Sequence, residues 1–192
     1  MSTLTRYAGP LALLAGVIWV IVILIQMVAP NGPTWIGLFP SVLLIGGAAL
    51  GLQRRIGART GRLGRGGAAA TAVGSVAFIT VVLFSLATGQ FDTSTPPPPI
   101  LRAFLLSSFF LWFLGSLVFA VGLIRAKAIE PIGGWLIVLG ALTTLPASLI
   151  AGGQNPPPVT YLPLVLYGIG WVLVGYAART PAPDLGLADQ AS

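Results

Sequence analysis

The sequence contains neither cysteine nor histidine. This excludes disulfides, thiolate nucleophiles, iron–sulfur clusters and histidine-ligated haem, together with most transition-metal sites. We therefore expect no cofactor and no bound metal. Charge is also scarce, because only 7% of the residues are Asp, Glu, Lys or Arg, whereas soluble domains carry roughly 25%.

The sequence is rich instead in apolar residues, which make up 56% of its 192 positions. A small domain buries only about 70% of the area of its unfolded chain, so no soluble packing would hide this much apolar surface. The chain is predicted to be an all-α, polytopic membrane protein covered by the lipid bilayer. Its abundance of Ala, Gly, Leu and Val resembles small multi-pass proteins of high-GC bacteria, which suggests the bacterial plasma (inner) membrane.

Six apolar segments reach or approach the ~20 residues that a spanning helix requires. They are expected at residues 7–28, 34–52, 68–88, 100–124, 132–151 and 159–178. The first is preferred as a transmembrane helix over a signal peptide, because no clean small-x-small cleavage site follows it. The segments form a single six-helix transmembrane domain over residues 1–180, and residues 181–192 are expected to be a flexible cytoplasmic tail.

The longest basic stretch, residues 53–67, separates the second and third apolar segments and contains no acid. Such a stretch stays on the cytoplasmic side of a membrane and fixes the orientation of its neighbours. Nine of the ten lysines and arginines fall on that side and only Arg102 on the other, so both termini are predicted to be cytoplasmic. The arginines expected to contact anionic lipid head groups are Arg54, Arg55, Arg59, Arg62 and Arg65.

Two further questions are which partner the net charge of the chain favours and whether residues 53–67 are helical. The overall charge of +6 would suggest nucleic acid in a soluble protein, but here most of it lies beside apolar segments, so lipid is expected and nucleic acid is not. Helical geometry would align some of the arginines on one face. Because Gly57, Gly61 and Gly64 interrupt that helix, a flexible loop lying on acidic lipids is predicted.

Glycine spacing indicates close helix packing and a weak internal repeat. Gly46, Gly47 and Gly51, with Ala48 and Ala49, predict a small-residue face, and the Gly47-x-x-x-Gly51 pattern within it predicts a close helix–helix approach. Paired glycines near the start of each odd-numbered segment allow two interpretations, three tandem two-helix hairpins or chance matches in a glycine-rich chain. These glycine pairs are Gly9 and Gly16, Gly67 and Gly74, and Gly134 and Gly140.

No Asp, Glu, Lys or His lies within the core of a predicted span, which argues against a proton pump or a carboxylate-driven antiporter. Polar side chains instead gather toward the outer ends of the spans and in the fifth span. One interpretation is that these side chains line an outward-facing vestibule for a small polar solute, and capping of helix ends and turn backbone is the preferred one. The predicted vestibule residues are Gln26, Gln90, Gln154, Asn155, Thr143 and Thr144.

Three tryptophans, Trp19, Trp112 and Trp171, lie deep in predicted spans. Stacking on a pigment, quinone or lipid is one interpretation, and filling of space between helices is the preferred one.

Three functional hypotheses follow. The preferred one is a non-enzymatic accessory or assembly subunit of a larger membrane complex. The alternative is a small transporter or channel for a neutral or lipid-like solute. An enzyme acting on lipid comes third, because Asp92 and Arg102 are its only charged candidates.

Overall fold

The computed structural model describes residues 3–29, 35–89, 98–127, 130–151 and 157–179, and the regular elements within these ranges are all helices. The predicted all-α class is therefore confirmed. In chain order the elements are α1 (Thr3–Val28), α2 (Trp35–Ala87), α3 (Pro99–Arg125), α4 (Pro131–Ala151), the short 3-10 helix η1 (Pro158–Tyr161) and α5 (Leu162–Ala177).

Proline and glycine mark several helix boundaries. Pro99 and Pro131 are the first residues of α3 and α4, where a missing amide hydrogen leaves no helical hydrogen bond unmade. Just beyond the end of α2, Gly89 has a φ of 67° and donates its amide hydrogen to the carbonyl of Leu86. A residue with positive φ here ends the helix, and glycine takes this conformation without strain.

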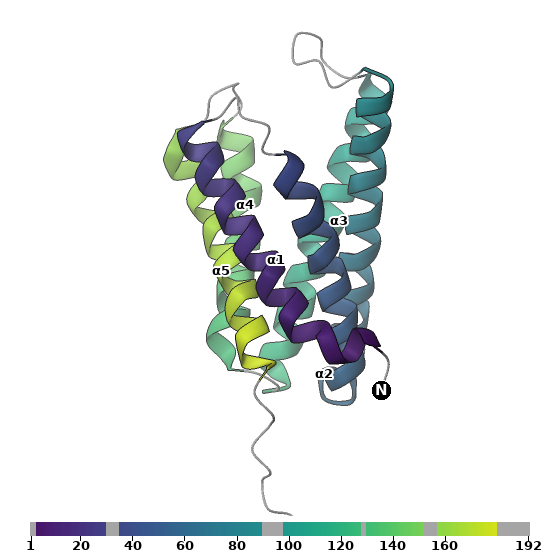
Figure 1. The fold of residues 1–192 in the computed structure, drawn as a ribbon, viewed down its shortest axis with the longest axis vertical. Helices are drawn as coiled ribbons and strands as arrows, with labels where there is room; N and C mark the ends of the chain where they lie inside the picture. The colour runs from purple at the N-terminus through teal and green to yellow at the C-terminus, as the bar shows by residue number, and fades with distance from the viewer. Residues whose placement is uncertain (1–2, 30–34, 90–97, 128–129, 152–156, 180–192) are drawn as a thin grey trace, which may run out of the picture.

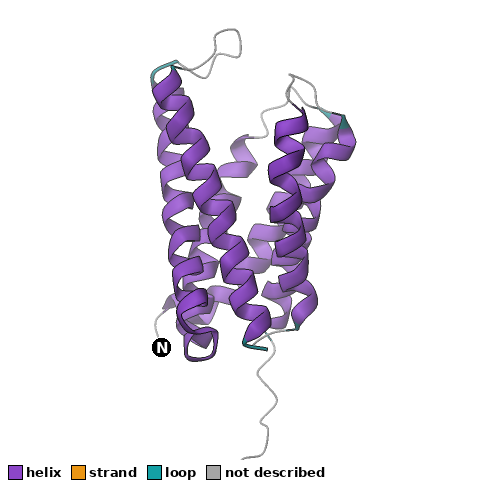
Figure 2. Cartoon of the chain, turned by 180° about the vertical axis from the view of Figure 1, so that it is seen from behind, coloured by secondary structure: helices purple, strands orange, loops and turns teal. Residues whose placement is uncertain are grey.

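The helix α2 is a hairpin rather than a single rod. A straight helix of 53 residues would be about 80 Å long. At Gly61, however, φ is 62° and ψ is −150°, a combination that is essentially restricted to glycine. The chain reverses there, so a first arm (residues 35–60) and a second arm (residues 62–87) lie side by side with the turn at one end of the bundle (Figures 1 and 2).

The predicted flexible loop over residues 53–67 is wrong, because these residues are helical on both sides of Gly61. Two of the glycines expected to break the helix lie instead against side chains of the hairpin. A Cβ added at Gly57 would meet the Gln53 side chain, and one at Gly64 would meet Thr60 and Gln53. Their lack of a side chain therefore permits packing inside the hairpin, and only Gly61 interrupts the helix.

The helices form a closed ring of neighbours (Figure 1). Around the ring, α1 contacts the first arm of α2, the second arm contacts α3, α3 contacts α4, α4 contacts α5, and α5 returns to α1. The two arms of α2 meet where Gly46 faces Ser75. Helices distant in the sequence, α1 and α5, thus close the bundle.

Four helices in the described part of the chain are long and apolar enough to cross a membrane: α1, α2, α3, and α5 together with η1. The described apolar part of α4, Pro131–Thr144, is shorter. Many large apolar side chains also point outward, including Phe104, Val76 and Ile21, each more than half exposed. A bundle with an apolar exterior is suited to a hydrocarbon environment.

The helix contacts depend on glycines that bring backbones together. A Cβ at Gly67 would lie 2.9 Å from the carbonyl oxygen of Gly115 on α3, and a Cβ at Gly16 would lie 2.6 Å from that of Gly168 on α5. Small residues allow this close approach in membrane bundles. The predicted glycine pairs do not pack equivalently, however. Gly67 and Gly140 face the next helix in the sequence, whereas Gly16 faces α5 at the far end of the chain.

The predicted contact at Gly47 is also wrong. A Cβ added at Gly47 would meet no atom of a neighbouring helix within 4 Å, whereas one at the preceding Gly46 would lie 2.8 Å from the Ser75 hydroxyl oxygen. Successive helical residues point about 100° apart, so adjacent glycines cannot both face the same neighbour. Of the small-residue face predicted from the sequence, Gly46 lies against the other arm of α2, whereas Gly47 of the GxxxG pattern does not.

Candidate functional site

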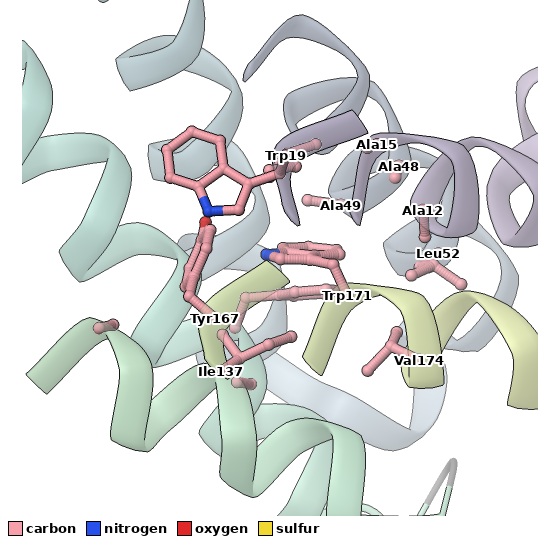
Figure 3. Close-up of a cluster of buried hydrophobic side chains, with 14 of the residues drawn as sticks. Ala12, Ala15, Trp19, Ala48, Ala49, Leu52, Ile137, Tyr167, Trp171 and Val174 are labelled. Atoms are coloured by element: carbon pink, nitrogen blue, oxygen red, sulfur yellow. The ribbon is translucent and has the colours of Figure 1, made fainter. Parts of the chain in front are cut away.

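Aromatic side chains occupy the axis of the helix ring. Trp19 of α1, Trp112 of α3 and Tyr167 of α5 pack edge to face, with ring centroids 5.2 Å apart between Trp19 and Trp112 and 5.8 Å between Trp112 and Tyr167. Edge-to-face pairs at this separation are attractive. Figure 3 shows Trp19, Tyr167 and Trp171 converging on a common centre. We call Trp19, Trp112, Tyr167 and Trp171 the aromatic axis.

The aromatic axis supports the space-filling interpretation of the deep tryptophans. Trp19 is 2% exposed, Trp112 is 1% exposed and Trp171 is fully buried. Tyr167, which was not singled out from the sequence, is also fully buried. Its position one helical turn before Trp171, in the middle of an apolar span, was the available signal.

Two hydrogen bonds fix the aromatic axis to neighbouring helices. Tyr167 and Ser116 of α3 share a hydrogen bond of 2.8 Å between their hydroxyl oxygens. The Trp19 indole Nε1 donates to the backbone carbonyl of Leu164 at 2.8 Å. Trp19 reaches this carbonyl because Gly168 has no side chain there; a Cβ at that position would lie 2.6 Å from the Trp19 ring. The axis is therefore held by polar contacts as well as by packing.

Other polar atoms on the axis have incomplete hydrogen bonding. Trp112 Nε1 is buried without an acceptor in the described part of the protein. Trp171 Nε1 approaches the Tyr167 hydroxyl without forming a hydrogen bond of standard geometry. A buried donor without a partner costs about 1–3 kcal/mol. The axis thus combines neutral donors and acceptors with apolar rings, and these groups can hold helices together or contact a neutral molecule.

Most hydroxyl groups in the described parts of the spans bond to a carbonyl of their own helix and do not link helices. Thr71 donates to the carbonyl of Gly67, and Ser75 donates to the carbonyl of Thr71, each at 2.8 Å and each on its own helix. Such bonds satisfy the hydroxyl within apolar surroundings. Ser116 is the exception described above, since its partner lies on another helix.

Only three of the six residues predicted to line the outer vestibule lie within the described residues. Gln26 is half-buried near the end of α1, whereas Gln90, Gln154 and Asn155 lie outside the described residues. Thr143 is exposed and donates to the carbonyl of Leu139 at 2.6 Å. Thr144 is buried and donates to the carbonyl of Gly140 at 2.6 Å. The two threonines therefore point in different directions, and each bonds to its own helix.

The five arginines predicted to contact lipid are all exposed and lie on the helical hairpin of α2. We call residues 53–67 the arginine hairpin. The Gln53 side-chain oxygen accepts a hydrogen bond of 2.8 Å from the buried Thr60 hydroxyl on its inner side. Arg55 differs from the other arginines, because its Nη1 donates to the backbone carbonyl of Ala178 at the end of α5.

The charged candidates for lipid chemistry do not form a described site. Arg102 is exposed near the start of α3, and Asp92 lies outside the described residues. Within the described ranges there is also no group of three side chains able to hold a metal ion.

No protein-family model, curated protein or solved structure matches this chain. Its class therefore rests on the fold alone. The four long apolar helices indicate a membrane-spanning, multi-pass helical protein.

Proposed function

We propose that the chain is a non-enzymatic accessory or assembly subunit of a larger complex in the bacterial plasma membrane. In this proposal it crosses the bilayer six times, with both termini in the cytoplasm. The α1, α3, α4 and α5 helices supply one crossing each, and the arms of α2 supply two. The end that carries the arginine hairpin faces the cytoplasm, in agreement with its excess of basic residues.

The filled aromatic axis is the observation that carries the subunit proposal. Rings from α1, α3 and α5 meet at the centre and are fixed by the Tyr167–Ser116 and Trp19–Leu164 hydrogen bonds. Such a centre serves to hold the bundle in one arrangement. The bulky outward-facing side chains, exemplified by Phe104 and Val76, then remain available to lipid or to another membrane subunit.

The crossing arrangement can be tested directly because the chain has no native cysteine. Single cysteines are introduced at Ala58 in the arginine hairpin and at Thr88 beyond the other end of the second arm, both of which are exposed. In intact cells, a membrane-impermeant maleimide should label the cysteine at position 88. It should label the one at position 58 only after permeabilisation, and the reverse pattern would refute the orientation.

The subunit role is tested by photo-crosslinking in cells followed by purification in mild detergent. A photoreactive amino acid replaces the outward-facing Phe104, Val76 or Ile21, and the buried Phe113 serves as the control position. We expect one outward face to give a stoichiometric crosslink to a specific membrane protein, with none from position 113. A chain that purifies alone and monodisperse, without a crosslink from any outward face, would contradict the proposal.

A small transporter for a neutral or lipid-like solute is the second candidate, favoured by the polar atoms on the aromatic axis. Trp112 Nε1 has no acceptor among the described residues, and the Tyr167–Ser116 pair lies among the surrounding rings. In an apolar interior, a neutral solute that accepts hydrogen bonds would complement these donors.

Proteoliposomes test this candidate with two probes, glycerol and a fluorescent phosphatidylcholine. If the candidate is correct, the purified chain should accelerate equilibration of one probe over protein-free liposomes. The Tyr167→Phe variant should change that rate while remaining folded. Equal rates with and without protein for both probes would remove the candidate.

A further inference from the structure

The arginine hairpin extends beyond the end of its neighbour α5. The Arg55–Ala178 hydrogen bond brings the tip of the Arg55 side chain to the end of α5. The turn at Gly61 follows six residues later, which corresponds to about 9 Å of helix. Helix α3 accompanies the hairpin, since Gly122 packs against the backbone of Gly64. Figure 1 shows the α2 turn lying past the end of α5.

This extension matches the thickness of a lipid head-group layer. The polar layer on each side of the hydrocarbon core is about 5–8 Å thick. If α5 ends at the hydrocarbon boundary, Arg59 and Arg62, which flank the turn, lie at the level of the lipid phosphates. A soluble partner would not require cations at this particular depth, so the position favours lipid.

The arginines of the hairpin divide into two groups. Arg55 is engaged by the carbonyl of Ala178, at the negative end of the α5 dipole. The others are exposed, and no ion pair joins two of the described residues. Gln53 and Thr60 bond to each other on the inner side of the hairpin, which leaves the arginines to its outer surface.

We propose that Arg54, Arg59, Arg62 and Arg65 form a docking surface for the phosphate groups of anionic phospholipids, whereas Arg55 is a latch between the hairpin and α5. The guanidinium group suits this role because it donates several hydrogen bonds to phosphate and stays charged. The proposal rests on the orientation proposed above but is independent of the subunit role.

Lipid selectivity of the full chain tests the docking surface. The protein is purified in a neutral detergent and mixed with equimolar phosphatidylglycerol and phosphatidylcholine that carry the same acyl chains. Native mass spectrometry then gives the ratio of the two lipids bound. Each arginine near an anionic surface is worth about 1 kcal/mol, or about fivefold. The wild-type chain should prefer phosphatidylglycerol, and the R54Q/R59Q/R62Q/R65Q variant should lose that preference.

Arg55 and Arg59 provide a matched pair, because they are one helical turn apart on the same arm. R59Q should lower the lipid ratio about fivefold, whereas R55Q should change it by less than twofold. The R54K/R59K/R62K/R65K variant keeps the charges and should retain the preference. Thermal unfolding confirms that each variant is folded, and if the quadruple glutamine variant is not, R59Q and R62Q are compared singly.

Several outcomes would overturn the inference. Equal binding of the two lipids by the wild-type chain would do so, as would an unchanged ratio in R59Q and R62Q. Displacement of phosphatidylglycerol by inorganic phosphate at the same concentration would identify a site for free phosphate instead. Binding of soluble polyglutamate in preference to phosphatidylglycerol would identify a surface for an acidic protein.

Discussion

Neighbouring helices of the ring pack on one another through small residues, whereas the axis of the ring is packed with large ones. We call the contacts between neighbouring helices the wall of the ring. Along the wall, glycines such as Gly67 and Gly16 bring backbone atoms of adjacent helices into contact. On the axis, the large rings of Trp112 and Tyr167 fill the space that helices around a ring leave between them. The same bundle therefore needs the smallest residue at one radius and the largest residues at another.

This difference shows how an apolar sequence can specify one arrangement without charges in its core. In a membrane, burial of apolar side chains distinguishes poorly between alternative bundles, because lipid is equally apolar. Complementarity of shape then has to select the neighbours. A glycine allows close approach only to a neighbouring helix whose backbone fits against it. The tryptophans require a central space that matches the size of their rings.

The largest loss of stability is expected when a ring is removed from the aromatic axis. Trp112→Ala removes a buried ring that contacts Trp19 and Tyr167 and should lower the free energy of unfolding by about 3–5 kcal/mol. Trp135→Ala is the matched control, because Trp135 is 53% exposed. Unfolding in mixed detergent micelles, followed by the remaining tryptophan fluorescence, measures both variants. Equal effects of the two substitutions would show that the axis is not the centre of packing.

A side chain inserted into the wall should have the next largest effect. Gly67→Leu forces a side chain toward Phe119, whose Cα would lie 2.7 Å from the new Cβ, and should cost about 2–3 kcal/mol. Gly66→Leu is the control in the adjacent position, since a Cβ there meets nothing within 4 Å. The same unfolding measurement applies. If both variants are equally stable, the second arm of α2 does not pack on α3 through Gly67.

A smaller loss of stability is expected when the hydrogen bond between Tyr167 and Ser116 is removed. Tyr167→Phe removes the hydroxyl bonded to Ser116, and Ser116→Ala removes its partner. Side-chain hydrogen bonds between membrane helices contribute about 0.6 kcal/mol on average and up to about 1.7 kcal/mol. A double-mutant cycle of unfolding free energies should give a coupling in this range. Additive effects of the two substitutions would show that the hydroxyls do not interact.

The packing of the axis could be predicted from the sequence, but the packing of the wall could not. Long apolar segments predicted helices, and the depth of Trp19, Trp112 and Trp171 predicted their burial, because both follow from local composition. The partner of each glycine depends on helix rotation. Gly46 and Gly47 look alike in the sequence, yet only Gly46 faces another helix.

The polar contacts of the candidate sites were beyond prediction for a different reason. Tyr167 and Ser116 are 51 positions apart, and Arg55 and Ala178 are 123 positions apart. Neither pair has a local pattern that marks it. The arginine hairpin was misinterpreted because glycines that weaken an isolated helix also permit close packing, and only tertiary contacts distinguish the two roles.

The latch at Arg55 should have the smallest effect on stability, which sets it apart from both wall and axis. Arg55→Gln weakens the hydrogen bond to the carbonyl of Ala178 and removes a positive charge from the end of α5. Such an interaction is worth about 0.3–1 kcal/mol at an exposed position. Arg59→Gln, one turn away and without this bond, should leave the unfolding free energy unchanged. The difference between the two variants should diminish in high salt, because screening reduces the dipole contribution but leaves the packing of the wall and the axis intact. A salt-independent difference, or equal loss in both variants, would mean that Arg55 does not act through the end of α5.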